Sequence, residues 1–349
     1  MMHSIEETAI LNSSTSQFVL SNGLRCVHIA DSSVAEMAGV FINAGSADDP
    51  ADRHGLAHFV EHTVFKGTKR RSSWHINNRM EAVGGELNAY TSKEETFIYA
   101  VGPQGCTERA IELIADLIAD ATFQTREIDI ERGVIADEID TYLDSPSDAA
   151  YDDFEDMLFA GTPLGHNILG SRESIAAITG DDCRRFVEMN YTADNMVAFY
   201  IGAASRARVE QLCDRHFGRI TRLKPTPPPV SVPEPGLFNA ARKIDSHQAN
   251  TVGGSLTAGR RSPHRTALLL LANITGGTGM NALLNLELRE KRGLVYSVES
   301  STSFYRDTGM FTVSYGCDPH NEQRCRRVAS TLLQSRLERF LTPRRIEAA

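Results

Sequence analysis

Two histidines and a glutamate stand close together in the segment His58-Phe-Val-Glu-His62. On an α-helix, residues at positions i, i+3 and i+4 share one face, so His58, Glu61 and His62 are expected to point to the same side. Two imidazoles one turn apart can hold a single Zn²⁺, and a carboxylate beside them can take a proton from water. The spacing therefore predicts a zinc site with His58 and His62 as ligands and Glu61 as general base.

A catalytic zinc needs three protein ligands and keeps one position open. Two candidates for the third ligand, Glu131 and Glu138, lie seven residues apart in a predicted helix and therefore on one face. The apolar positions expected to anchor this helix to the core are Val134, Ile135 and Ile139. On the residues alone, either glutamate could complete the site.

The predicted chemistry is hydrolysis. Zinc can lower the pKa of a bound water to about 7, and the hydroxide would attack a carbonyl carbon while Glu61 passes the proton to the leaving amine. The other interpretation of Glu61 is a surface ion pair with a lysine such as Lys66, which the complete motif disfavours.

Composition narrows the class of protein. The chain has 349 residues, 41% of them hydrophobic, and a net charge of −9, which fits two soluble domains and argues against nucleic acid as a general partner. No apolar run is long enough for a transmembrane helix, and the N-terminus lacks the apolar segment of a secretory signal. The six cysteines include no C-x-x-C pair, which favours reduced thiols and a cytoplasmic location.

The elements that must position the motif follow from turn residues and apolar spacing. A hairpin is expected over 18–29 around Asn22-Gly23, and the motif helix should end near Gly67. Further strands are predicted at 37–43, 86–92, 95–101, 196–201, 251–257, 295–303 and 310–314. Further helices are predicted at 73–83, 107–121, 127–143, 148–159, 206–217, 263–274, 280–291 and 322–341.

The chain divides at a proline-rich stretch. Six of its 13 prolines fall there: Pro225, Pro227, Pro228, Pro229, Pro233 and Pro235. Such a stretch is extended, so 223–236 is predicted to be a linker between a zinc-binding domain at 17–222 and a second domain at 237–349, with a tail at 1–16. Because both halves show a helix, two strands and a helix in succession, we expect two related α+β domains, each an antiparallel sheet packed with helices.

The motif and its surroundings resemble a known family. The segment from His58 to Thr68, the runs Leu87-Asn-Ala-Tyr-Thr91 and Glu131 to Ile139, and Leu288-Arg-Glu-Lys-Arg-Gly-Leu-Val-Tyr296 are similar to those of the pitrilysin-type inverzincin zinc metallopeptidases. The closest branch is that of the bacterial and mitochondrial processing peptidases. The resemblance covers about 16–349 and implies a processing-peptidase-like metallohydrolase fold.

This resemblance implies roles for particular residues. It makes Glu138 the third ligand of one Zn²⁺ per chain and Glu131 a supporting residue that orients the site. The strand of Leu87, Asn88, Ala89, Tyr90 and Thr91 would bind a peptide or unfolded polypeptide by adding it to the sheet as an extra strand. Arg289 and Tyr296 would act from the second domain on the substrate and the oxyanion.

The resemblance also implies a clamshell chamber built by two such chains, as a homodimer or with a homologous partner. Family members run several tens of residues further, so the second domain is expected to lack its C-terminal helices. The preferred function is a zinc-dependent endopeptidase. One alternative is a non-catalytic scaffold or assembly subunit of the same fold, which the intact motif disfavours. Another is a zinc hydrolase of small amides, which the peptide-binding strand disfavours.

Overall fold

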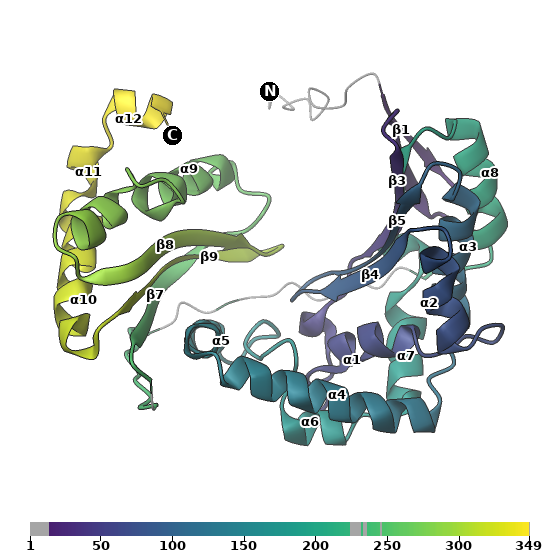
Figure 1. The fold of residues 1–349 in the computed structure, drawn as a ribbon, viewed down its shortest axis with the longest axis horizontal. Coiled ribbons are helices and arrows are strands. Elements are labelled where there is room, and N and C mark those ends of the chain that lie inside the picture. The colour runs from purple at the N-terminus through teal and green to yellow at the C-terminus, as the bar shows by residue number, and fades with distance from the viewer. Residues whose placement is uncertain (1–13, 224–231, 233–235, 245, 349) are drawn as a thin grey trace. The chain divides into compact units, whose positions relative to one another are not determined.

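The computed structural model describes residues 14–223, 232, 236–244 and 246–348. They form two compact units (Figure 1). The first consists of the described residues of Met1–Asp137 and Asn167–Pro227, and the second of those of Glu138–His166 and Pro228–Ala349. Most of the predicted tail and of the predicted linker lies outside the described residues, although the first strand begins within the tail, at Thr15.

The first unit is built on a six-stranded sheet with the strand order β1-β2-β6-β3-β5-β4. The strands are β1 (Thr15–Val19), β2 (Arg25–Ala30), β3 (Ala35–Ile42), β4 (Glu86–Thr91), β5 (Thr96–Pro103) and β6 (Met196–Gly202). The predicted hairpin is β1 and β2, and its turn has Gly23 at φ +89°, a conformation that glycine adopts without strain. All neighbours are antiparallel except β2 and β6, which are parallel.

Helices cover one face of this sheet. They are α1 (Leu56–Val64), α2 (Ser73–Glu81), α3 (Thr107–Asp120), α4 (Thr125–Leu143), α6 (Arg172–Ala176), α7 (Gly180–Asn190) and α8 (Arg206–Phe217). In Figure 1, α2, α3 and α8 lie on the same side of the sheet, and α3 packs on β3 and β5. Leu113 and Ile114 of α3 and Val40 and Ile98 of the sheet have no exposed surface, so the core of this unit lies between these layers.

The second unit has a three-stranded antiparallel sheet in the order β7-β9-β8. Its strands are β7 (Ala249–Ala258), β8 (Val295–Phe304) and β9 (Thr308–Cys317), and its helices are α5 (Pro146–Leu158), α9 (Arg265–Gly276), α10 (Glu322–Thr331), α11 (Leu337–Phe340) and α12 (Pro343–Ala348). Two π-helices occur, at Asn285–Glu290 and Leu332–Arg336. The single helix predicted over 322–341 was therefore wrong, because the second π-helix separates α10 from α11.

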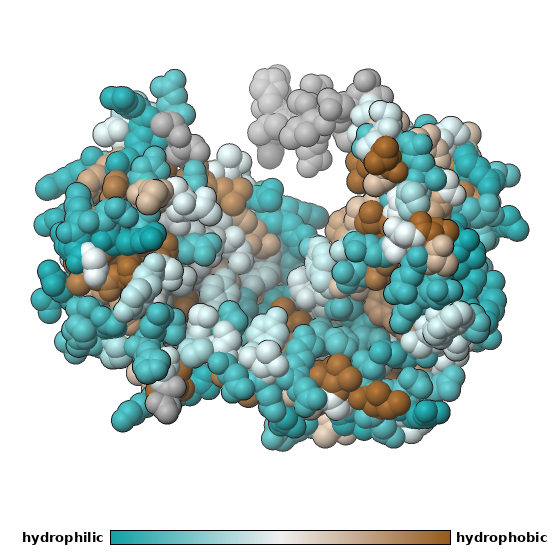
Figure 2. Space-filling view, viewed as in Figure 1, coloured by the Kyte–Doolittle hydropathy of each residue, from teal (hydrophilic) through white to brown (hydrophobic). Residues whose placement is uncertain are grey.

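The predicted α+β class is confirmed, with the parallel β2–β6 pair as the exception to a wholly antiparallel first sheet. The prediction that Val134 anchors α4 was wrong. Its side chain is 47% exposed, as is that of Ile130 at 49%, while Ile135 has no exposed surface. Figure 2 shows hydrophobic side chains along the outer surface of α4. Among the described residues, no helix has the length and apolar character needed to cross a membrane.

Candidate metal centre

The motif helix α1 starts at a tightly specified turn. Gly55 has φ +91°, and a Cβ atom there would lie 2.5 Å from the carbonyl oxygen of Leu169, so only glycine fits. The Asp49 carboxylate accepts hydrogen bonds from the backbone N–H groups of Gly55, at 2.7 Å, and Ala57, at 2.8 Å. An anionic side chain at a helix N-terminus satisfies free donors and complements the helix dipole. Asp49 thus fixes the start of α1, a role that the sequence reasoning missed.

Burial orients α1. Its apolar residues Leu56, Phe59, Val60 and Val64 are at most 2% exposed. They attach the helix to the core and leave His58 and His62 on another side, with ring centroids 4.6 Å apart. The i, i+4 spacing thus brings the two rings together as predicted.

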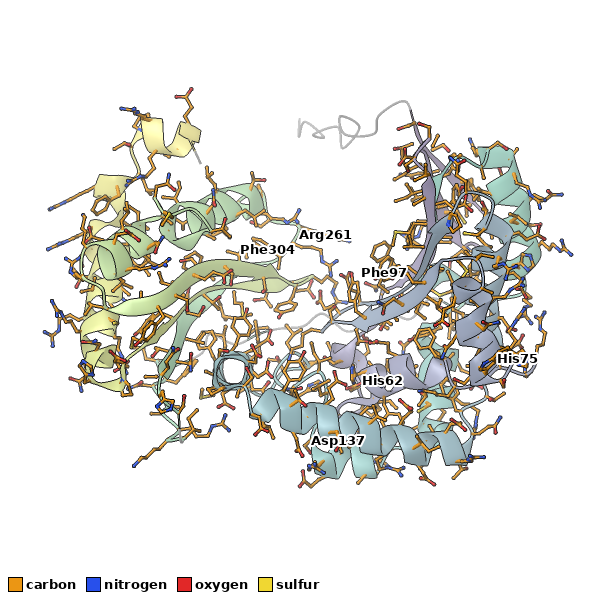
Figure 3. All side chains as sticks on the ribbon, viewed as in Figure 1. His62, His75, Phe97, Asp137, Arg261 and Phe304 are labelled. Carbon is orange, nitrogen blue, oxygen red and sulfur yellow. The ribbon has the colours of Figure 1, made fainter. Side chains whose placement is uncertain are left out.

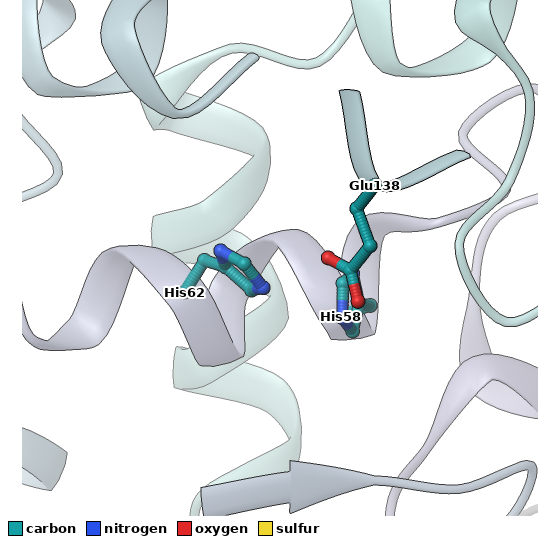
Figure 4. Close-up of side chains that lie close together, drawn as sticks. All are labelled: His58, His62 and Glu138. Atoms are coloured by element: carbon teal, nitrogen blue, oxygen red, sulfur yellow. The ribbon is translucent and has the colours of Figure 1, made fainter. Parts of the chain in front are cut away.

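The structure brings these two histidines together with Glu138 (Figure 4). One potential ligand atom from each of the three residues lies within 4.8 Å of the other two. Figure 3 shows His62 on α1 and Asp137, the residue before Glu138, on the neighbouring α4. Two imidazole nitrogens and one carboxylate oxygen form the His₂Glu donor set of catalytic zinc, so these side chains fit the ion.

Electrostatics favour the ligating form of His58. Burial lowers the pKa of the His58 imidazole to about 3, and the neighbouring His62 lowers it further. His58 is therefore neutral at physiological pH, and a neutral imidazole has the free lone pair that a metal ion requires.

Glu131 lies beside this group and holds His62. The Nδ1 atom of His62 is 3.2 Å from Oε2 of Glu131, and Nζ of Lys66 is 2.7 Å from Oε1. Burial raises the pKa of the Glu131 carboxyl, but the bonds from His62 and Lys66 outweigh it and keep that pKa below its ordinary value. With Nδ1 directed at a carboxylate, Nε2 of His62 is the nitrogen available to a metal. Lys66, once considered as a partner of Glu61, pairs with Glu131 instead.

Glu61 is partly buried on the same helix and belongs to none of the three ligand positions. Its nearest printed influence is on Tyr191, which is 4% exposed. Burial raises the pKa of the Tyr191 phenol, and the negative charge of Glu61 raises it further. Tyr191 is a second neighbour of the site that the sequence reasoning did not find, because it lies far from the motif in the chain.

The predicted peptide-binding strand is β4, at the edge of the six-stranded sheet. Leu87, Ala89 and Thr91 alternate with the more exposed Asn88 and Tyr90. The Oδ1 atom of Asn88 accepts a hydrogen bond of 2.8 Å from the backbone N–H of Ala89. One main-chain donor of this edge strand is thus held by a side chain that an incoming strand could displace.

Arg289 and Tyr296 both lie in the second unit. Arg289 is exposed on the first π-helix, and Tyr296 is 56% exposed at an irregularity in the β8–β9 pairing. The Tyr296 hydroxyl donates to Oδ1 of Asp318 at 2.8 Å, and that hydrogen bond raises the pKa of the phenol. The two residues are described within this unit alone.

Two family models match the chain. Residues 26–172 match "Insulinase (Peptidase family M16)", and residues 177–342 match "Peptidase M16 inactive domain". An uncharacterized zinc protease of Mycobacterium leprae is 34% identical over 338 residues, covering 95% of this chain and 75% of that protein. A probable mitochondrial-processing peptidase subunit beta of Arabidopsis thaliana is 30% identical over 306 residues, covering 84% of this chain and 58% of that protein.

Solved structures share the fold. A structure from Pseudomonas fluorescens, described as a peptidase M16 inactive domain, has a TM-score of 0.88 at 19% identity and covers 97% of this chain and 82% of that one. A protease from Helicobacter pylori has a TM-score of 0.82 at 22% identity and covers 93% of this chain and 83% of that one.

Proposed function

This chain belongs to the insulinase family, peptidase family M16, and from that premise we propose that it is a zinc-dependent endopeptidase acting on peptides or unfolded polypeptide segments. The predicted pitrilysin-type family is confirmed by these matches. The observation that carries the proposed activity is the convergence of His58, His62 and Glu138 within 4.8 Å. The name zinc protease carried by relatives supports the same activity.

In this proposal, one Zn²⁺ per chain is held by His58, His62 and Glu138. When bound, the ion supplies a Lewis acid for peptide hydrolysis. The Glu61 carboxylate accepts a proton from the attacking water and delivers it to the amide nitrogen, so that cleavage yields a carboxylate and an amine. Glu131 acts as a positioning residue, since it holds Nδ1 of His62 at 3.2 Å.

The substrate backbone would pair with β4 through Leu87, Asn88, Ala89, Tyr90 and Thr91. Main-chain pairing gives affinity with little demand on sequence, which suits unfolded segments. Arg289 and Tyr296 would assist from the second domain, whose boundaries we propose at 237–349 after a zinc-binding domain at 17–222. We also propose a homodimer, or pairing with a homologous chain, and a cytoplasmic location, which fits the six free and buried cysteines.

The test compares wild type, Glu61→Gln and Glu138→Gln for zinc content and for cleavage of an internally quenched peptide library. Wild type should hold one zinc per chain and lose cleavage with a chelator. Glu61→Gln should keep zinc and lose activity by on the order of 10²–10⁴-fold, whereas Glu138→Gln should lose most of its zinc. Glu127→Gln, on the same helix, is the matched control.

Two results would contradict the proposal. Cleavage retained by Glu61→Gln would refute the assigned mechanism. Zinc-loaded wild type that cleaves nothing in the library would favour the rival function, a non-catalytic scaffold subunit. That rival draws on the description of the model matching 177–342 as an inactive domain.

A further inference from the structure

Five aromatic side chains contact one another on the first sheet. The ring centroid of Phe97 lies 4.2 Å from that of Phe41 and 4.8 Å from that of Tyr99. The rings of Tyr90 and Phe199 are each 5.3 Å from it. These distances are those of stacked and tilted aromatic pairs. We call the five residues the aromatic face: Phe41, Tyr90, Phe97, Tyr99 and Phe199.

Strand register puts all five rings on one side of the sheet. Tyr90 of β4 is opposite Phe97 of β5, which is opposite Phe41 of β3. In the next row on the same side, Tyr99 and Phe199 flank Gly39. Because side chains alternate along a strand, Val40 and Ile98 point to the other side, where they are buried. Figure 3 shows Phe97 on the side of the sheet opposite the helices.

Gly39 allows the rings to close up. A Cβ atom there would lie 2.5 Å from the Phe199 ring, so the absence of a side chain lets that ring lie across β3 toward Phe97. Phe97 is 7% exposed and supports the others, while Phe41 and Tyr90 remain 40% and 45% exposed. An aromatic surface this exposed is uncommon on a sheet unless it meets a ligand or partner.

We propose that the aromatic face binds bulky apolar side chains of the unfolded polypeptide substrate, and so selects segments rich in such residues. The inference rests on the proposed function. The occupant follows from continuity, because Tyr90 contributes its ring to the aromatic face and its backbone to the edge strand β4. No charged residue interrupts the two rows across β4, β5, β3 and β6, so the surface is matched to apolar groups and not to a charged segment.

The two contacts serve different purposes. Pairing with β4 recognises any backbone, whereas the aromatic face distinguishes side chains. Aromatic rings bind apolar groups at low cost in conformational entropy because they have only two rotatable bonds. A segment anchored on these rings would be retained near β4 without a demand on the sequence at the bond that is cleaved.

The test measures binding without turnover, in the Glu61→Gln background loaded with zinc. Two fluorescein-labelled unstructured peptides are compared by fluorescence anisotropy, one with two phenylalanines and one with alanine at those positions. The phenylalanine peptide should bind about tenfold more tightly. Phe41→Ser should remove most of this preference and Phe41→Tyr should retain it. Val19→Ser is the control, since Val19 is 64% exposed on the same sheet and makes no aromatic contact.

Zinc content and thermal melting of each variant show that the site and fold are intact. Equal affinity for the two peptides, or an unchanged preference in Phe41→Ser, would overturn the inference. So would a dimer that dissociates in Phe41→Ser while the preference stays, because the aromatic face would then be an interface between copies. If wild type cleaves nothing but the preference holds, the proposed function fails and this inference stands.

Discussion

The most informative single change is at Glu131, which touches the metal centre without belonging to its three-ligand group. Its side chain is 3% exposed and meets two cationic or hydrogen-bonding partners, Nδ1 of His62 at 3.2 Å and Nζ of Lys66 at 2.7 Å. Glu131→Gln keeps the shape and one acceptor oxygen but removes the charge. Glu131→Ala removes both.

The expected magnitudes follow from these contacts. A carboxylate that holds a ligating histidine is worth about 10–100-fold in metal affinity. Glu131→Gln should be near the lower limit, because an amide oxygen can still accept from Nδ1, and Glu131→Ala near the upper limit. These factors correspond to about 1.4 and about 2.8 kcal/mol of binding free energy. Loss of the buried partner of Lys66 should also destabilise the fold by about 1–3 kcal/mol.

The assay is a competition titration of zinc against a chromophoric chelator, with urea unfolding of the metal-free protein measured in parallel. Glu127→Gln removes a charge from the same helix and is the control, with unchanged zinc affinity expected. If both Glu131 variants bind zinc within twofold of wild type while their folds are native, the positioning role is refuted. The hydrogen bond to His62 would then have no bearing on the metal.

Two further predictions concern stability. Asp182 is buried, which raises the pKa of its carboxyl, but hydrogen bonds from Thr179 and an ion pair with Arg185 outweigh burial and lower that pKa below its ordinary 3.8. Its stabilising effect should be complete above pH 3.8 and disappear as the pH falls through the folded-state value, so melting curves of wild type and Asp182→Asn should differ at pH 7 and converge near pH 3. On α4, Ile135→Ala should cost about 2–5 kcal/mol in urea unfolding, and Val134→Ala less than about 0.5 kcal/mol; equal losses would mean that the exposed fractions of 0% and 47% do not describe the folded protein.

The metal centre was predictable where its geometry is local. His58, Glu61 and His62 share a helix face because of helix periodicity alone, and the hairpin of β4 and β5 follows from two apolar runs around a short turn. The Asp49 cap was not predicted, because its carboxylate reaches Gly55 and Ala57 only after the chain between them has folded back. Likewise, β2 pairs with β6 across more than 160 residues, a contact that no local pattern encodes.

The mistake on α4 has a physical lesson. Its buried positions are Ile128, Glu131, Ile135 and Ile139, at helical spacing, and Val134 lies off this stripe. Had the stripe been placed on the three isoleucines, Glu131 would have stood out as a carboxylate in a core position. A charge that conflicts with its apolar surroundings is expected at functional sites, so the correct stripe would have assigned Glu131 to the metal centre without any resemblance.

The two units share one plan but only one set of ligands. In the first, β3, α1, α2, β4, β5 and α3 follow in order, and the strands lie as β3-β5-β4. In the second, β7, α9, a π-helix, β8, β9 and α10 follow, and the strands lie as β7-β9-β8. The helix α9 is in the place of α1, but its sequence Arg-Thr-Ala-Leu-Leu-Leu-Leu-Ala-Asn-Ile-Thr-Gly has no histidine or carboxylate. The described residues accordingly hold one His₂Glu group. A repeated scaffold therefore does not predict a repeated reaction, because the ligands are side chains that the packing of the sheet does not require. For the same reason the edge strand β8, which carries Tyr296, offers the second unit a surface like that of β4 without a metal centre beside it.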